Sequence, residues 1–513
     1  MALPEGDFIV WPPESWKAQY SEYTLHSAWY SGDPDRLANY YEMQVYNPLF
    51  PRSFFWARLN GEERRIFVHV PIAGDICKAS ADLLFSESPK IGISEADEIT
   101  KDPAAIKAQD RLVAILEANQ VQNKLLEGAE TCAGLGGVFL KANWDKEVAD
   151  FPILSIAQAD AALPEFRYGF LTACTFWRVI GEDGNDVYRL LERHERGIIL
   201  YGLYKGTVAY LGQRISLNSI PEETQGLKDT ISTGVEDILC RYIPNMRPNR
   251  KDRASYLGQA DFAGCESLMD SLDETFTSWL RDVRLSQGRI IAPDSFFERI
   301  EETDGTVNFR FNLDKEAYMK VSSPPSPDSN TSNQITLSQF AIRSAEHEQT
   351  AINFLERIIT AAGYSPQTFG LEIAGRAESG TALNLRERKS ILTKQTKERY
   401  WKPAIEEILE LMLQLDARYF SSGIIPYRPQ VAFGDSVTPT LREMAESVEL
   451  LNRAQAATTK TKVRLLHPDW SDEQVEAEAQ EISEQSMVSL TEFGPDGKTT
   501  DDSKMMENEG APE

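Results

Sequence analysis

Few residues in this chain have types and spacings that support metal or nucleophilic chemistry. His194 and His347 are each followed by a glutamate, as at the start of a zinc-protease helix. The fourth residue after these histidines is Ile198 or Ala351, where a second histidine ligand would be needed. The five cysteines form no C-x-x-C pair, and their odd number predicts reduced, buried thiols: Cys77, Cys132, Cys174, Cys240 and Cys265. The sequence therefore predicts no metal site and no cofactor.

The glycine-containing segments do not match nucleotide-binding motifs either. Gly497-Lys498-Thr499 would need a glycine at Glu492 to form a phosphate-binding loop. Residues 133–137 lack the third glycine of a dinucleotide-binding fingerprint and lead into 138–145, which alternates like a strand. A turn that enters a strand is the simpler interpretation. No G-x-S-x-G motif places a serine nucleophile, so the sequence predicts that the protein is not an enzyme.

Composition limits the classes of partner. The 513 residues carry 53 Lys+Arg against 79 Asp+Glu, a formal charge of −26, and 42% of them are hydrophobic. This is enough apolar material for about three folded domains. The acidic balance argues against wrapping nucleic acid and against binding an anionic membrane. The N-terminus lacks the order of a signal peptide and no run of about 18 apolar residues occurs, so we expect a soluble, intracellular protein without membrane contact.

The elements that would position any site fall into an α+β, predominantly helical pattern. Residues 1–260 mix helix, over roughly 103–130, with strands. Strands are predicted at 187–192, 197–204 and 207–211, and Lys205-Gly206 is predicted to join the last two as a tight hairpin. Two prolines between 241 and 250 then interrupt regular helix.

Two long helices bracket a short β region. The first is predicted over 261–288 with Asp261 as its N-cap, and its length of about 27 residues corresponds to ~40 Å. The second is predicted over 336–362 and ends at Gly363. Between them a hairpin with Asp304-Gly305 at its turn precedes the polar loop 322–334.

A third long helix is predicted from Thr381, after a small-residue segment at 371–380 that should be mobile. Pro403 should kink this helix. Residues 386–402 hold seven basic and two acidic side chains, and the partner of this net charge of +5 is either an acidic neighbouring surface or solvent, or a nucleic-acid backbone. Helices are also predicted from 438 to about 457 and after Ser471, and the chain is predicted to be disordered from about 490.

This order of elements resembles the portal, or head-to-tail connector, proteins of tailed bacteriophages. Four strings carry the resemblance: Gly136 to Leu140 before Trp144-Asp145, Phe262 to Glu274, Ala362 to Gly370, and Ser379 to Leu383. It covers about residues 100–480 and is strongest from 240 to 405.

The resemblance implies a ring, typically of twelve subunits, at one capsid vertex of the virion. Double-stranded DNA would pass through the ring during genome packaging and ejection. The implied partners are the terminase large subunit, the major capsid and scaffolding proteins, and a neck or head-tail adaptor, with assembly in the host cytoplasm. Two alternatives remain open at this point: another ring-forming neck or tail adaptor, and an intracellular hydrolase with a carboxylate cleft.

The resemblance also divides the chain into regions: wing, 1–260; first stem helix, 261–288; clip, 289–335; second stem helix, 336–363; tunnel loop, 364–380; long kinked helix and return to the wing, 381–437; crown, 438–490; disordered acidic tail, 491–513. The role of residues 1–100 stays open. The candidates for the DNA channel are Glu372, Arg376, Glu378, Ser379 and Lys389. The candidates for the clip interface with terminase or adaptor are Glu298, Arg299, Asp304 and Arg310.

Overall fold

The structure is a computed structural model that describes residues 3–6, 8–44, 55–56, 67–94, 102–224, 226–286, 289–291, 298–301, 307–310, 336–338, 342–371, 380–434, 441–454, 456–467, 470 and 472–492. The chain divides into two compact units. The first comprises residues 1–373 and 389–434, and the second comprises 374–388 and 435–513. Predictions for the loop 322–334, Asp304-Gly305, residues 372–379 and the tail after 492 lie outside the described residues.

Two antiparallel sheets of three or more strands lie in the described part of the first unit. The larger has the order β4-β5-β6-β7-β8, with β9 also paired to β7. Its strands are β4 (Ala162–Arg167), β5 (Phe170–Asp183), β6 (Asp186–Glu195), β7 (Ile198–Gly206), β8 (Gln213–Ile215) and β9 (Thr230–Ser232). The smaller sheet has the order β10-β2-β3, formed by β2 (Gly137–Asn143), β3 (Ile153–Gln158) and β10 (Cys240–Pro244). The predicted strand after the glycine turn at 136–137 is therefore confirmed.

The predicted hairpin at Lys205-Gly206 is wrong. Strand β7 continues through Gly206, and its hairpin partner is the preceding strand β6, in the register Glu195↔Ile198. Residues 207–211 hydrogen-bond instead to the N-terminal segment, where Trp11 N donates to Ala209 O and Leu211 N donates to Ile9 O. The alternating pattern of 207–211 suited a strand, but a segment from the other end of the sequence provides its partner.

The first unit also contains helices that precede or separate these strands in the sequence. They are α1 (Lys17–Ser31), α2 (Pro34–Gln44), α3 (Ile72–Phe85), α4 (Pro103–Ala118), α5 (Val121–Leu135) and the short α6 (Pro221–Thr224). The helical pattern at 103–130 is two helices, because Gln120 adopts a left-handed φ of 49°. Asn119 makes this break possible, since its side chain donates to Pro152 O and accepts from Leu154 N, which ties the corner to the small sheet. Strand β1 (Lys90–Gly92) pairs with β15 (Gln430–Ala432).

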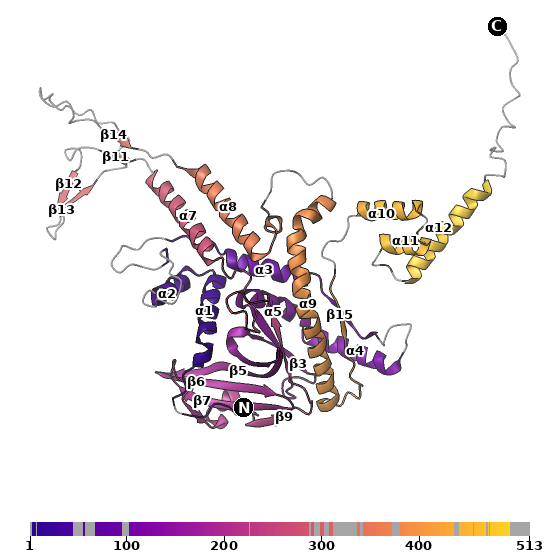
Figure 1. The fold of residues 1–513 in the computed structure, drawn as a ribbon, viewed down its shortest axis with the longest axis horizontal. Coiled ribbons are helices and arrows are strands. Elements are labelled where there is room, and N and C mark those ends of the chain that lie inside the picture. Colours follow the sequence, from indigo (N-terminus) through magenta and orange to yellow (C-terminus); the bar gives the residue numbers. More distant parts are fainter. Residues whose placement is uncertain are drawn as a thin grey trace, which may run out of the picture. The chain divides into compact units, whose positions relative to one another are not determined.

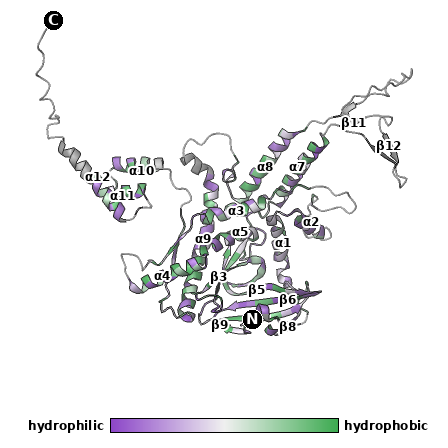
Figure 2. Ribbon diagram, turned by 180° about the vertical axis from the view of Figure 1, so that it is seen from behind, coloured by the Kyte–Doolittle hydropathy of each residue, from purple (hydrophilic) through white to green (hydrophobic). Residues whose placement is uncertain are grey.

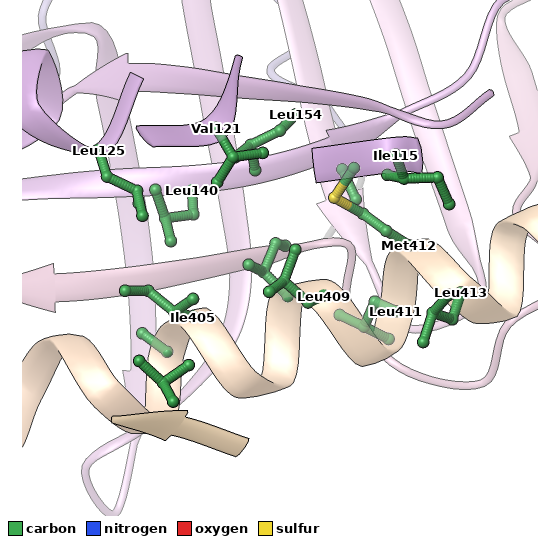
Figure 3. Packing of buried hydrophobic residues seen from close by; sticks show 14 of the residues in the cluster. Ile115, Val121, Leu125, Leu140, Leu154, Ile405, Leu409, Leu411, Met412 and Leu413 are labelled. Carbon is green, nitrogen blue, oxygen red and sulfur yellow. The ribbon is translucent and has the colours of Figure 1, made fainter. Parts of the chain in front are cut away.

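A 40-residue helix, α9 (Gly380–Tyr419), runs along the first unit and is continuous through Pro403 (Figure 1). Its apolar side chains face α4, α5 and strand β2 in the largest core cluster. Figure 3 shows Ile405, Leu409 and Met412 of α9 directed toward Ile115 and Leu140. This packing removes a long apolar stripe from water, which is the main force that holds such a helix.

The two long helices on either side of the β excursion are α7 (Glu266–Leu285) and α8 (Ser344–Ala362). The excursion contains β11 (Arg289–Ile291) paired with β14 (Thr336–Ser338) and the hairpin of β12 (Glu298–Glu301) with β13 (Val307–Arg310). The second helix thus begins at Ser344, not at 336, because 336–338 is a strand. The predicted C-cap is confirmed, since Gly363 has φ 102° and donates to the carbonyls of Ile359 and Thr360.

The second unit contains α10 (Leu441–Arg453), α11 (Thr459–Leu466) and α12 (Asp472–Glu492). Helices α10 and α12 were predicted, whereas α11 was not. It is eight residues long and begins at the N-cap Thr458, whose side chain accepts from Thr461 N.

Candidate functional site

Helices α7 and α8 form an antiparallel pair, which both ribbon views show side by side (Figures 1 and 2). The last turns of α7 contact the first turns of α8. Arg343 donates to Asp282 at 2.8 Å, His347 lies 3.0 Å from the same carboxylate, and the rings of Trp279 and His347 stack. These His347 and Arg343 hydrogen bonds lower the pKa of Asp282. The ion pairs therefore set the register of the pair at the end next to the β excursion.

The opposite end of the pair is held by a buried polar cluster centred on Asp261. Lys397 Nζ lies 2.6 Å from Asp261 Oδ2, and the side chains are 2% and 0% exposed. Tyr364 donates to the same oxygen at 2.7 Å, and Asn245 Nδ2 donates to Oδ1 at 2.7 Å. Lys397 also donates to Ser80 Oγ at 2.5 Å. Burial, and then the adjacent Asp261 charge, raise the pKa of Tyr364 well above its usual value, so it remains a donor.

This cluster, here called the Asp261 cluster (Ser80, Asn245, Asp261, Tyr364 and Lys397), joins five parts of the chain. Its members lie on α3, just after β10, just before α7, just after α8 and on α9. The entry to α7 and the exit from α8 are therefore fixed to the same point of α9. Buried charges need such complete pairing, because an unpaired buried charge is strongly unfavourable.

The role of Asp261 differs from the sequence prediction. It was expected to cap a helix over 261–288, but α7 begins at Glu266 after turns at 261–264, and Cys265 occupies the N-cap position. The Asp261 carboxylate is used by Lys397, Tyr364 and Asn245, so it is not available to the helix N-terminus. An aspartate before an apolar stripe is a good cap signal, and only the distant Lys397 overrides it.

The basic stretch 386–402 is correspondingly divided. Lys397 belongs to the Asp261 cluster, and Lys394 is buried with Glu398 Oε1 3.6 Å away and Gly434 O 2.8 Å away. Arg399 and Lys402 are exposed. Lys394 and Lys397 are thus buried with partners inside the subunit, an outcome that neither surface interpretation of the run included.

The N-terminal region, whose role was open, contacts α7. His69 Nδ1 lies 2.8 Å from Asp273 Oδ2, and both side chains are almost fully buried. The backbone N–H of Val70 donates to the other Asp273 oxygen, and that of Val68 donates to Thr277. Burial raises the pKa of Asp273, although the His69 hydrogen bond opposes this. Residues 67–70 therefore lie along α7 and are held to it by these hydrogen bonds.

The predicted channel residues are only partly covered by the structure. Glu372, Arg376, Glu378 and Ser379 lie outside the described residues. Lys389 is on α9, exposed, and its ammonium donates to the carbonyl of Thr360 in the last turn of α8. This is a favourable position for a cation, because the last carbonyls of a helix lack N–H partners. Lys389 thus makes a second link between α8 and α9.

The predicted clip residues lie on the excursion between α7 and α8. Glu298 pairs in register with Arg310 across the β12–β13 hairpin, and Arg299 pairs with Phe309. Asp304 lies outside the described residues.

The described residues contain no group of three or more His, Cys, Asp or Glu placed to hold a metal ion. Among the same residues no helix is long and apolar enough to cross a membrane. All five cysteines are free and buried, as predicted. Burial raises the pKa of the Cys265 thiol to about 11, so it stays protonated at neutral pH.

Comparisons with known proteins identify the family. No curated protein matches the chain. A chain in the solved structure titled "Virion of native gene transfer agent (GTA) particle" is 11% identical, with coverage of 90% of this chain and 96% of that chain and a TM-score of 0.38. The family described as "Phage portal protein, SPP1 Gp6-like" matches residues 215–487, which is more than half of the 513 residues and includes α7, α8 and α9. The chain therefore belongs to the SPP1 Gp6-like family of phage portal proteins.

Proposed function

We propose that this protein forms the ring-shaped channel at one capsid vertex through which double-stranded DNA is packaged and later ejected. The observation that carries the proposal is the antiparallel α7–α8 pair, fixed to α9 by the Asp261 cluster, within the region that matches the portal family. A rigid helical pair rooted in a larger α+β body is a suitable wall element for a channel. The protein is structural and belongs to the virion.

The regions of the portal are assigned as follows in this proposal. Helices α7 and α8 form the stem, and the β11–β14 excursion between them forms the clip, which docks the terminase large subunit and then the neck or head-tail adaptor. Residues 364–380 form the tunnel loop, and α10 to α12 form the crown. The sheets and the N-terminal helices form the wing, which meets the major capsid and scaffolding proteins.

The charge of the chain suits a conduit. Each phosphate neutralised by a lysine or arginine adds to DNA affinity, so a strongly basic lumen would retain the duplex. A chain with a formal charge of −26 repels the phosphate backbone on average. DNA can then slide while a few cations make brief contacts.

The purified full-length chain tests this proposal. Native mass spectrometry together with electron microscopy should show a closed ring, with about twelve subunits as is usual for portals and with a central hole wide enough for duplex DNA. A monomer or dimer at all concentrations would contradict the channel. A closed ring that fails to bind the clip partner but binds a tail component would favour a neck or tail adaptor instead.

A further inference from the structure

An exposed aromatic and basic surface lies at the tip of the β4–β5 hairpin. Tyr168 is 84% exposed and Phe170 is 77% exposed, although both are large apolar side chains. The turn is tight, because Tyr168 and Gly169 both have positive φ values of 53° and 86° between the paired residues Arg167 and Phe170. This is the backbone of a two-residue hairpin turn that matches the twist of its strands. The tip is therefore presented on a well-defined support.

A second segment extends this surface. Tyr256, which is 37% exposed, has its ring centroid 5.5 Å from that of Phe166, and a Cβ at Gly169 would lie 3.4 Å from it. Arg247 lies over the Tyr256 ring at 5.6 Å, and Arg167 lies over the Tyr168 ring at 5.5 Å. We call this surface the aromatic knob, and it comprises Arg167, Tyr168, Phe170, Arg247 and Tyr256.

The charge of the aromatic knob is opposite to that of the chain. Segments 166–170 and 247–256 together carry five basic residues and one acidic residue, in a protein with a formal charge of −26. Tyrosine and arginine are the residue types enriched at the energetic centres of protein interfaces. The knob therefore fits an acidic protein surface with an apolar depression.

The same chain offers such a surface on α4 and α5. A hollow of about 370 Å³ is lined by Val113, Leu116, Glu117 and Val121, among others. On α4, Ile106, Asp110, Val113 and Glu117 are all exposed and follow one another at helical spacing. Apolar and acidic side chains thus alternate along this stripe. We call the hollow and the adjoining α4 stripe together the acidic hollow, and it comprises Ile106, Asp110, Val113, Leu116, Glu117 and Val121.

The two surfaces lie on different flanks of the first unit. Lys251, in the knob's second segment, pairs with Glu22 of α1 at 3.3 Å. Figure 1 places α1 and α4 on opposite sides of α5 and α9. Two different, complementary surfaces on opposite flanks give a heterologous contact, which generates a closed ring when the rotation between neighbouring subunits closes. An isologous, two-fold contact would need one self-complementary surface instead.

We propose that the aromatic knob of one subunit docks into the acidic hollow of a second copy of this chain, as part of the contact between neighbouring subunits. The aromatic rings fill the hollow, and Arg167 and Arg247 approach Asp110 and Glu117. This inference rests on the ring proposed above. It identifies the two surfaces through which neighbouring subunits of that ring contact each other.

Cross-linking of the full-length chain tests the contact directly. The five natural cysteines are buried, so a double variant, Tyr168→Cys with Val113→Cys, carries two accessible thiols on different flanks. A short bismaleimide should produce a ladder of covalent multimers in the double variant. Each single variant should stay monomeric on a denaturing gel. Dimers from Tyr168→Cys alone would show a two-fold contact and overturn the proposal.

A second pair of variants measures the contribution to assembly. The double variant Tyr168→Ser/Phe170→Ser should lower the association constant of the ring at least tenfold, whereas the control Lys146→Glu/Val148→Ser, also at exposed positions, should leave it unchanged. A wild-type chain that forms no ring would overturn both the channel and this contact. A wild-type ring that persists in the Tyr168→Ser/Phe170→Ser variant, with no ladder in the cysteine variant, overturns the contact alone.

Discussion

The ammonium of Lys397 lies 2.6 Å from the carboxylate of Asp261, and the two side chains are 2% and 0% exposed although 136 residues separate them in sequence. This ion pair connects α9 with the segment that leads into α7. Tyr364, directly after α8 and its cap Gly363, donates to the same carboxylate oxygen. Any force that moves the α7–α8 pair relative to α9 must therefore act against one shared, buried polar cluster.

We expect Lys397→Met to destabilise the subunit by about 3–5 kcal/mol, because it leaves the Asp261 carboxylate buried without its cation. Denaturant unfolding followed by circular dichroism measures this loss. Lys402→Met is a matched control, since Lys402 is on the same helix but exposed, and its effect should stay within about 0.5 kcal/mol. The combined variant Lys397→Met/Asp261→Asn should recover part of the loss. Equal stabilities of Lys397→Met and Lys402→Met would contradict the structural role of the pair.

The larger sheet provides a prediction about acid stability. Burial alone would raise the pKa of Glu192, but Lys141 at 2.7 Å and His194 at 2.7 Å outweigh it and hold the pKa well below its usual value. A carboxyl with a depressed folded pKa stabilises the fold above its unfolded pKa of about 4.3 and loses this contribution as the pH falls toward the folded value.

Glu192→Gln should therefore lower the free energy of unfolding by about 1.5–3 kcal/mol at pH 7, which is the range for hydrogen bonds to charged groups. The difference in free energy of unfolding between this variant and the wild type should become smaller as the pH falls below about 4. Unfolding curves at several pH values measure it, with the exposed Glu182→Gln on the same sheet as control. A difference that is constant over this pH range would show that the carboxylate charge is not the cause.

We expect the proposed tunnel loop, residues 364–380, to grip DNA. We expect deletion of residues 372–378 to lower the packaging rate or the retention of packaged DNA in an assembled particle. A replacement of the same length by glycine and serine separates the contribution of Glu372, Arg376 and Glu378 from that of loop length. Unchanged packaging and retention in the deletion variant would mean that the loop only closes contacts between subunits.

The hairpin of the proposed clip should contribute to terminase docking through its charges. Arg310→Glu reverses the charge at one position of the β12–β13 hairpin, where the backbone of residue 310 pairs with that of residue 298. Binding of the terminase large subunit to the ring, measured by a pull-down or by interferometry, should fall at least tenfold. Ring formation should persist, and Lys146→Glu should bind as the wild type does. Undiminished binding would place the docking surface elsewhere.

The helices of this protein could be recognised from the sequence because their signals are local. An apolar stripe marked the helices that became α7, α8 and α9, the glycine C-cap marked the end of α8, and Asp304-Gly305 marked the β12–β13 hairpin that the strand pairing confirms. Periodicity and capping depend on residues within a few positions of each other, so one sequence is sufficient to read them. The resemblance to portal proteins rested on the order of these elements, and the family match confirms it.

Partner choice between distant segments was decided only by the tertiary structure. Helix α7 begins at Glu266 and not at the predicted Asp261, because Lys397 binds the carboxylate that would have capped the helix. The strand expected at 207–211 pairs with the N-terminal segment near Trp11, and residues 67–70 bind Asp273 of α7. A charged or alternating segment has the same local signature whether its partner is solvent, a neighbouring subunit or a buried group 100 residues away. Only the packing of the chain determines which partner is near enough, and the cost of burying an unpaired charge then fixes the pair.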